Sequence, residues 1–132
     1  MSFARALPEG LEFTPLPVDG RNGLPQAFPF RFDGVTYHFR LYPNLSAEEV
    51  AAQPERWELP LASGGHLVVS VEQEDPGGGR RPLFLRKVLP GLVYEVGQIL
   101  LTFPDQTLAR LNLNGLGEAG SKLSGGIARR WA

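Results

Sequence analysis

Two histidines and their acidic neighbours come closest to a chemical site in this chain. His38 and His66, with Glu58 or Glu72, would supply a two-histidine, one-carboxylate metal site. Their spacing does not require one, because no His-x-x-x-His or His-x-His pair presents two imidazoles to the same ion. We therefore expect surface or interior-facing histidines that bind no metal, and no other cofactor. The 132 residues also include no cysteine, which excludes thiolate metal sites, disulfides and a thiol nucleophile.

A glycine run followed by two arginines suggests phosphate binding at first sight. The run is Gly77-Gly78-Gly79-Arg80-Arg81. A phosphate cradle needs glycines that open a helix, so that backbone N–H groups point at the anion. Here Pro82 and a strand-like run follow instead, and the lysine and hydroxyl of a P-loop are missing. We expect a hairpin tip, with Arg80 and Arg81 paired across the hairpin to the acidic residues Glu72, Glu74 and Asp75.

The remaining patterns give no support for catalysis. The adjacent carboxylates Glu48 and Glu49 diverge around a helix, so they do not converge on one substrate. No Gly-x-Ser-x-Gly motif is present to expose a serine nucleophile. The sequence therefore predicts a protein that is not an enzyme.

Nucleic-acid binding would need basic residues next to stacking aromatics. Such groups exist, but thirteen basic residues face fourteen acidic ones, which gives a formal net charge of -1. This balance does not favour a phosphate-neutralising surface. The groups are Arg31 with Phe30 and Phe32, Arg40 with Tyr42, and Arg129-Arg130 with Trp131.

These residues must be positioned by short elements, because twelve prolines leave no room for a long helix. A hairpin is the clearest element. Asp33-Gly34 is a dipeptide favoured in two-residue hairpin turns. Apolar residues alternate on both sides of it, which predicts two strands with one core-facing side. The alternating residues are Phe28, Phe30 and Phe32 before the turn and Val35, Tyr37, Phe39 and Leu41 after it.

The segment 46–53 is the one good helix candidate. Ser46 can cap its first turn, and Glu49 stands three residues later, as in a capping box. Pro54 then ends the helix. Further strands are expected at 57–61, 66–74, 82–89, 92–96, 98–103 and 107–113.

Short strands separated by turn signals indicate an all-β protein, a small antiparallel β-barrel or β-sandwich with one short helix. We expect a single β domain over residues 1–113. Residues 114–132 form a glycine-rich C-terminal arm or a last strand, which packs on the same domain or on a neighbouring subunit. Arg129, Arg130 and Trp131 would anchor it, because arginine and tryptophan are enriched in buried interfaces.

Composition adds two expectations. No apolar run approaches the roughly 18 residues of a membrane helix, and no signal peptide is apparent, so we expect a soluble protein made in the cytoplasm. Twelve prolines with one methionine and no cysteine fit a thermostable protein, although a coding bias with many turns gives the same composition.

A family resemblance lies in the first hairpin and the segment after it. Phe28-x-Phe30, Gly34-x-x-Tyr37, Tyr42-x-Asn44 and Trp57-x-Leu59 together resemble the opening hairpin of small phage baseplate plug proteins, over roughly residues 26 to 61. The 46–54 insertion is longer than that pattern. The resemblance implies an all-β structural component of a phage tail or phage-like particle. It also implies a symmetric assembly with other protein subunits as partners, a possible homo-oligomer, and no catalytic residues.

Two functional hypotheses follow. In the first, the chain is a non-enzymatic structural protein of such a particle. It contacts other subunits through Arg80 and Arg81 at the loop tip and through Arg129, Arg130 and Trp131 in the tail, and its domain should fold without residues 121–132. In the alternative, a small-ligand-binding β-barrel is lined by aromatic side chains, with His38 or His66 at its mouth. The lining residues would be Tyr37, Phe39, Tyr94 and Phe103.

Overall fold

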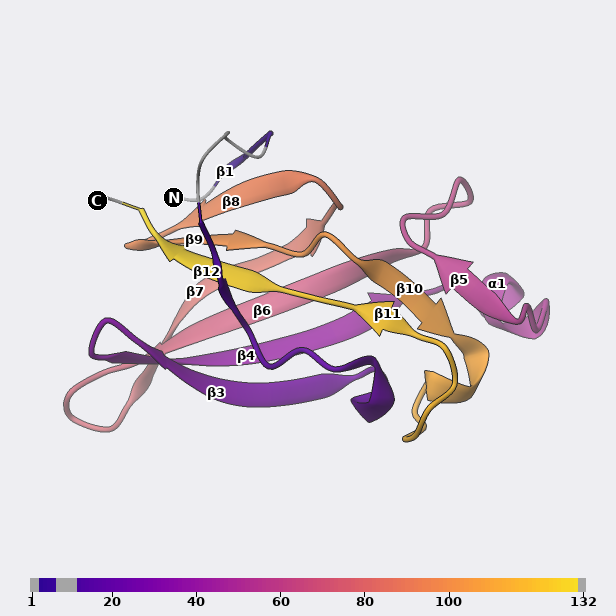
Figure 1. The fold of residues 1–132 in the computed structure, drawn as a ribbon, viewed down its shortest axis with the longest axis horizontal. Helices are drawn as coiled ribbons and strands as arrows, with labels where there is room; N and C mark the ends of the chain where they lie inside the picture. Colours follow the sequence, from indigo (N-terminus) through magenta and orange to yellow (C-terminus); the bar gives the residue numbers. More distant parts are fainter. Residues whose placement is uncertain (1–2, 7–11, 131–132) are drawn as a thin grey trace.

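Three antiparallel sheets make up the fold (Figure 1). The structure, a computed structural model, describes residues 3–6 and 12–130. A five-stranded sheet has the order β1-β8-β9-β12-β2, and a four-stranded sheet has the order β3-β4-β6-β7. The first comprises β1 (Phe3–Ala6), β8 (Leu92–Val96), β9 (Ile99–Thr102), β12 (Gly126–Arg129) and β2 (Thr14–Pro15). The second comprises β3 (Gln26–Phe32), β4 (Val35–Asn44), β6 (His66–Glu74) and β7 (Arg80–Val88).

A smaller sheet of order β11-β10-β5 lies at the other end of the molecule from the β3–β4 turn (Figure 1). Its strands are β11 (Lys122–Leu123), β10 (Gln106–Ala109) and β5 (Arg56–Glu58). The helix α1 (Ala47–Ala51) is next to β5, and two 3-10 turns, η1 (Gly20–Asn22) and η2 (Arg110–Asn112), complete the elements.

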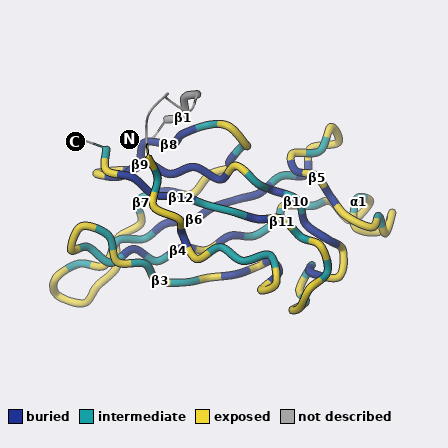
Figure 2. Tube along the Cα trace, viewed as in Figure 1, coloured by how far each residue is buried: buried dark blue, intermediate teal, exposed yellow. Residues whose placement is uncertain are grey.

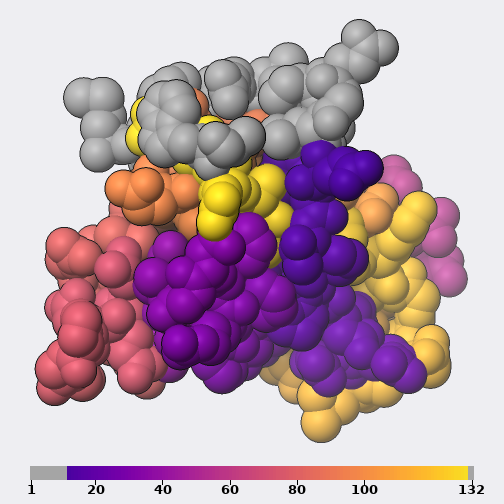
Figure 3. Space-filling model, turned by 60° about the vertical axis from the view of Figure 1, so that its left-hand side comes forward, coloured from indigo at the N-terminus to yellow at the C-terminus, as the bar shows by residue number. Residues whose placement is uncertain are grey.

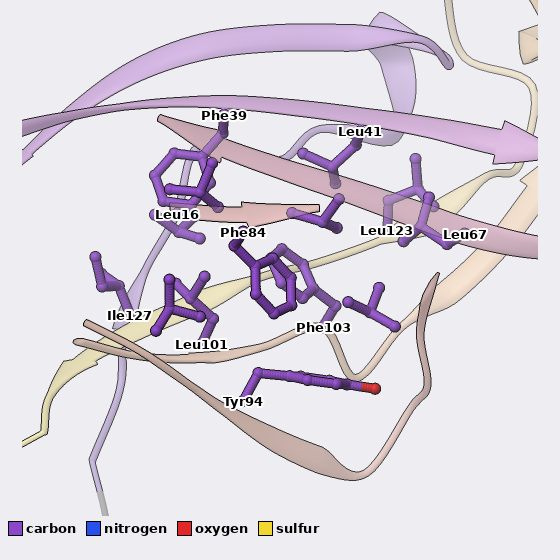
Figure 4. Packing of buried hydrophobic residues seen from close by; sticks show 14 of the residues in the cluster. Leu16, Phe39, Leu41, Leu67, Phe84, Tyr94, Leu101, Phe103, Leu123 and Ile127 are labelled. Carbon is purple, nitrogen blue, oxygen red and sulfur yellow. The ribbon is translucent and has the colours of Figure 1, made fainter. Parts of the chain in front are cut away.

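The core lies between the two larger sheets. Figure 4 shows side chains from both sheets meeting there, and Figure 2 shows that the buried positions follow the strands while the connecting loops are exposed. The all-β fold is therefore confirmed, and it is a sandwich. A closed barrel is not formed, because the chain crosses from β7 to β8 through the Pro90-Gly91 turn without pairing the two strands.

The first hairpin forms as its pattern predicts. Asp33 and Gly34 both have positive φ, 51° and 79°, which a two-residue type I′ turn requires and which glycine adopts without strain. Phe32 then pairs with Val35, and the register continues to Gln26 opposite Leu41. Tyr37, Phe39 and Leu41 of β4 are buried, whereas Val35 and the phenylalanines of β3 are half-buried against the same core.

The helix is also capped as predicted. Ser46 Oγ accepts from Glu49 N–H at 3.1 Å, and Glu49 accepts in return from Ser46 N–H at 2.7 Å. The Glu49 carboxylate also accepts from the Ser63 hydroxyl and from Gly65 N–H. The Ser46 N–H first, and then these other donors, lower the pKa of Glu49 to about 2. One carboxylate thus joins the helix to the turn before β6.

Other boundaries differ from the predictions by a few residues. The strand expected at 57–61 is β5, Arg56–Glu58, and the strand expected at 82–89 is β7, Arg80–Val88. The run expected as a strand at 107–113 is divided between β10 and η2. The division follows from Asn112, whose buried side chain bonds to the backbone of the loop after it and so takes the chain out of the sheet.

The C-terminal strand is an internal strand of the five-stranded sheet. β12 pairs with β9 on one side and with β2 on the other, and Ile127 has no exposed surface. Gly126 is needed for this packing, because a Cβ at that position would lie 2.8 Å from the Phe13 Cβ. The expectation that the domain folds without residues 121–132 is therefore at odds with the packing.

The glycine-rich segment before β11 is held by one buried amide. Asn112 Nδ2 donates to the carbonyls of Gly115 and Gly117 at 3.2 and 3.0 Å, and its Oδ1 accepts from the Ser121 hydroxyl at 2.7 Å. Asn112 has no exposed surface. Three hydrogen bonds to one buried side chain thus hold a segment that has few apolar residues to pack.

Candidate interaction surface

Four connections meet at one end of the sandwich, which we call the hairpin end. They are the β3–β4 turn (33–34), the β6–β7 loop (75–79), the β8–β9 turn (97–98) and residues 129–130 (Figure 1). Figure 3 shows this end: the salmon β6–β7 residues lie beside the purple β3–β4 hairpin, with orange β8–β9 residues and yellow C-terminal residues above. Loops on a rigid sandwich are common binding surfaces.

The hairpin end holds the four predicted interaction arginines that the structure describes. Arg129 is the last residue of β12, and Arg81 stands opposite Gln73 in the β6–β7 ladder. Gln73 and Arg129 line the same hollow, so residues more than fifty positions apart in the sequence meet there. The fifth predicted residue, Trp131, lies outside the described residues.

Arg129 makes the strongest of the contacts. Its Nε donates to Asp33 Oδ2 at 2.6 Å, which joins the C-terminal strand to the turn of the first hairpin. This hydrogen bond raises the pKa of the Arg129 guanidinium, which therefore stays charged. Sequence reasoning missed Asp33 as a partner, because the two residues are 96 positions apart and no local pattern links them.

Arg80 and Arg81 pair with acidic residues across the hairpin, as predicted. Arg80 Nη1 is 3.8 Å from Glu72 Oε1, and Arg81 Nη2 is 3.6 Å from Asp75 Oδ1. Both pairs are long and exposed, so each contributes at most about 1 kcal/mol to stability.

Arg130 is held more firmly than the loop-tip arginines. Its Nη1 donates to the Gly97 carbonyl at 3.2 Å, and its Nε is 3.6 Å from Glu95 Oε1. Glu95 is buried on β8, and the Arg130 backbone N–H donates to the Gln98 carbonyl at 3.0 Å. Arg130 is therefore a structural clamp between the C-terminal residues and the β8–β9 turn.

Two shallow hollows lie between these connections. One, of about 300 Å³, is lined by Asp33, Tyr37 and Arg129 among others, and its neighbour of about 310 Å³ shares Val35 and Gln73 with it. Burial, and then the charge of Asp33, raise the pKa of the Tyr37 phenol. The hollows thus present a neutral phenol, amides and paired charges, which suit hydrogen bonds to a protein surface.

The two histidines do not meet. His38 Nε2 is 2.9 Å from Glu74 Oε2, whereas His66 Nδ1 contacts the Gly64 carbonyl at 2.8 Å. Across the β4–β6 ladder, His38 is opposite Glu72 and His66 is opposite Asn44, six residues further along β4. At about 3.3 Å per residue, the two positions are about 20 Å apart. No group of three or more metal-ligating side chains occurs in the described part of the chain.

The aromatic side chains named for the alternative, a ligand-lined barrel, lie in the core. Tyr37, Phe39, Tyr94 and Phe103 are all buried in the cluster between the sheets. Tyr94 packs edge-on against Phe84 at 5.7 Å between ring centroids (Figure 4). The Tyr94 hydroxyl accepts from Leu89 N–H at 2.7 Å. Of these four residues, only Tyr37 also borders one of the hollows described above.

Comparison with protein-family models, with curated protein sequences and with solved structures found no match. Within residues 3–6 and 12–130, no helix is long and apolar enough to span a membrane.

Proposed function

We propose that the chain is a non-enzymatic structural subunit that acts through contacts with other protein subunits. The setting implied by its first hairpin is a phage tail, baseplate or phage-like particle. On this proposal the hairpin end is the principal contact surface, and other subunits of a symmetric assembly are its partners.

The observation that carries the proposal is the gathering of arginines from two distant segments at the hairpin end. Arg80 and Arg81 are the first two residues of β7, Arg129 is the last residue of β12, and Arg130 follows it. Arginine is enriched at protein interfaces, where its planar fork makes several hydrogen bonds at once. Each of the four also has a carboxylate neighbour within 4 Å, so this end carries little unmatched positive charge. Such a balanced surface favours a protein partner over a polyanion.

The residue types that could do acid–base or metal chemistry have structural partners. His38 pairs with Glu74, His66 contacts the Gly64 carbonyl, and Glu49 caps the helix. These structural contacts explain the presence of the three side chains, so no catalytic role is needed to explain them. This supports a structural function.

Sedimentation from the native source tests the proposal. Particles would be separated on a density gradient, and this chain would be measured by mass spectrometry in every fraction. We expect the chain in the particle fractions, at a constant ratio to the other subunits. An R80A/R81A variant supplied in place of the natural chain should be depleted from these fractions. A chain found only at the top of the gradient would refute the proposal.

A further inference from the structure

One face of the four-stranded sheet faces away from the core and carries an excess of positive charge. Core-facing and outward-facing residues alternate along each strand, and the outward side of β3 includes Arg31. Arg40 on β4 stands opposite Ser70, and Ser70 stands opposite Leu85 on β7. We call this surface the basic sheet face; its cations are Arg31, Arg40, Arg80 and Lys87.

The carboxylates on this face do not neutralise it. Glu72 is beside Arg80, and Glu74 is engaged with His38. No ion pair within the described residues joins Arg31, Arg40 or Lys87 to a carboxylate. The basic sheet face thus has two more cations than anions. Leu85, in the same cross-strand row as Arg40, leaves 65% of its surface exposed.

A second surface, at the end of the molecule away from the β3–β4 turn, carries the opposite charge (Figure 1). Glu48 lies on α1, Glu55 lies between α1 and β5, and Glu58 lies on β5 (Figure 1). We call these three residues the acidic end. All three are exposed, and no ion pair in the described part of the chain uses their carboxylates. Two exposed cations are nearby, Arg56 on β5 and Arg110, whose backbone N–H donates to the Glu55 carbonyl at 3.0 Å. They offset two of the three negative charges, so one remains in excess. Val50 on α1 is 39% exposed, so this surface too presents an apolar side chain.

We propose that the basic sheet face of one copy binds the acidic end of a second copy. The proposal rests on the proposed function, for which it supplies a contact between identical subunits. Two basic faces repel each other, as do two acidic ends, so charge disfavours a twofold dimer that pairs either surface with its own copy. A basic face meeting an acidic end makes a head-to-tail contact, and such contacts build rings or filaments.

The presence of both charged surfaces on one chain also favours a second copy, rather than a nucleic acid, as the partner of the basic sheet face. A nucleic acid would be attracted by the sheet face and repelled by the acidic end, and the chain as a whole has a formal charge of -1. A second copy uses both surfaces at once. Leu85 and Val50 would be covered where the surfaces meet, and apolar area supplies the affinity that exposed charge pairs do not.

Sedimentation equilibrium of the purified chain tests the contact. At about 20 mM salt, where charges are weakly screened, we expect the average mass to rise with protein concentration. At about 300 mM salt we expect the association to weaken by about tenfold or more. An average mass that stays that of one chain up to about 1 mM protein at low salt would overturn the proposal.

Charge reversal locates the surfaces. The variant R40E/K87E makes the sheet face acidic, and E55K/E58K makes the acidic end basic. Each variant alone should stay monomeric, because both of its surfaces then carry the same sign. Mixed in equal amounts, the two should associate again, since every face then has a complementary end. The control E118K changes an exposed residue that belongs to neither surface and should associate like the natural chain. Circular dichroism melting curves would show that all variants are folded.

The outcomes separate this proposal from the proposed function. Self-association that survives both reversals, or a mixture that stays monomeric, would overturn the head-to-tail contact. A chain that self-associates as expected but never sediments with particles would refute the proposed function alone. A chain that enters particles but is monomeric by itself would refute the contact alone.

Discussion

Replacement of Ile127 by alanine tests whether β12 completes its own domain. Ile127 has no exposed surface and lies on the strand between β9 and β2. The substitution removes three buried carbons at about 0.8 kcal/mol each, which gives about 2.4 kcal/mol. A residual cavity of about 50 Å³ adds about 1 kcal/mol at roughly 24 cal/mol per Å³. We expect the free energy of unfolding to fall by about 3.5 kcal/mol.

Urea denaturation followed by circular dichroism would measure this loss. The denaturant midpoint should fall, and the slope should stay unchanged because the surface exposed on unfolding is nearly the same. Leu116→Ala is a suitable control, because Leu116 is 83% exposed and its truncation should change stability by less than about 0.5 kcal/mol.

Two results would refute this placement of the strand. One is a loss below about 1 kcal/mol, which is too small for a fully buried isoleucine. The other is a loss that depends on protein concentration, since a strand donated to another copy couples stability to association.

Three further predictions concern other sites. Asn112→Ala should lower the free energy of unfolding by about 3 kcal/mol in the same assay, because three hydrogen bonds made by a buried side chain are lost, at about 1 kcal/mol each. Ser46 N–H and other donors give Glu49 a folded-state pKa of about 2, below its usual 4.5, so its stabilising effect is present above pH 4.5 and is lost as the pH falls towards 2. E49Q should therefore lose less stability over that interval than the natural chain, as urea midpoints at each pH would show. R80A/R81A should lower stability by less than about 1 kcal/mol per ion pair, so a larger shift in its midpoint would contradict the exposed pairing.

Local features of the fold could be predicted because neighbouring residues determine them. The Asp33-Gly34 turn needs only two residues that tolerate positive φ, and the cap of α1 needs only Ser46 and Glu49 at the right spacing. Arg80 and Arg81 belong with these features, since a hairpin brings its two strand ends together. Their acidic partners could therefore be expected from the sequence.

Features that depend on distant segments could not be predicted. Nothing near Arg129 identifies Asp33 as its partner. The glycines after Asn112 indicated a projecting arm, because the sequence does not show that one buried amide would hold them. The need for glycine at position 126 could not be predicted either. Its lack of a side chain makes room for Phe13, which lies more than a hundred residues earlier. The sequence also left open whether the strands form a barrel or a sandwich, because the two differ only in which distant strands pair with each other.

The position of β12 has a consequence for how the protein is made. During synthesis β2 and β9 leave the ribosome before β12, yet β12 lies between them in the sheet. Until residues 126–129 emerge, both strands present unpaired edges and the five-stranded sheet stays incomplete. The four-stranded sheet is made of residues 26–88 and can form earlier, from contacts that are closer in sequence. The nascent chain therefore carries one finished sheet and one open one, and the open sheet is the part most exposed to aggregation or to a chaperone.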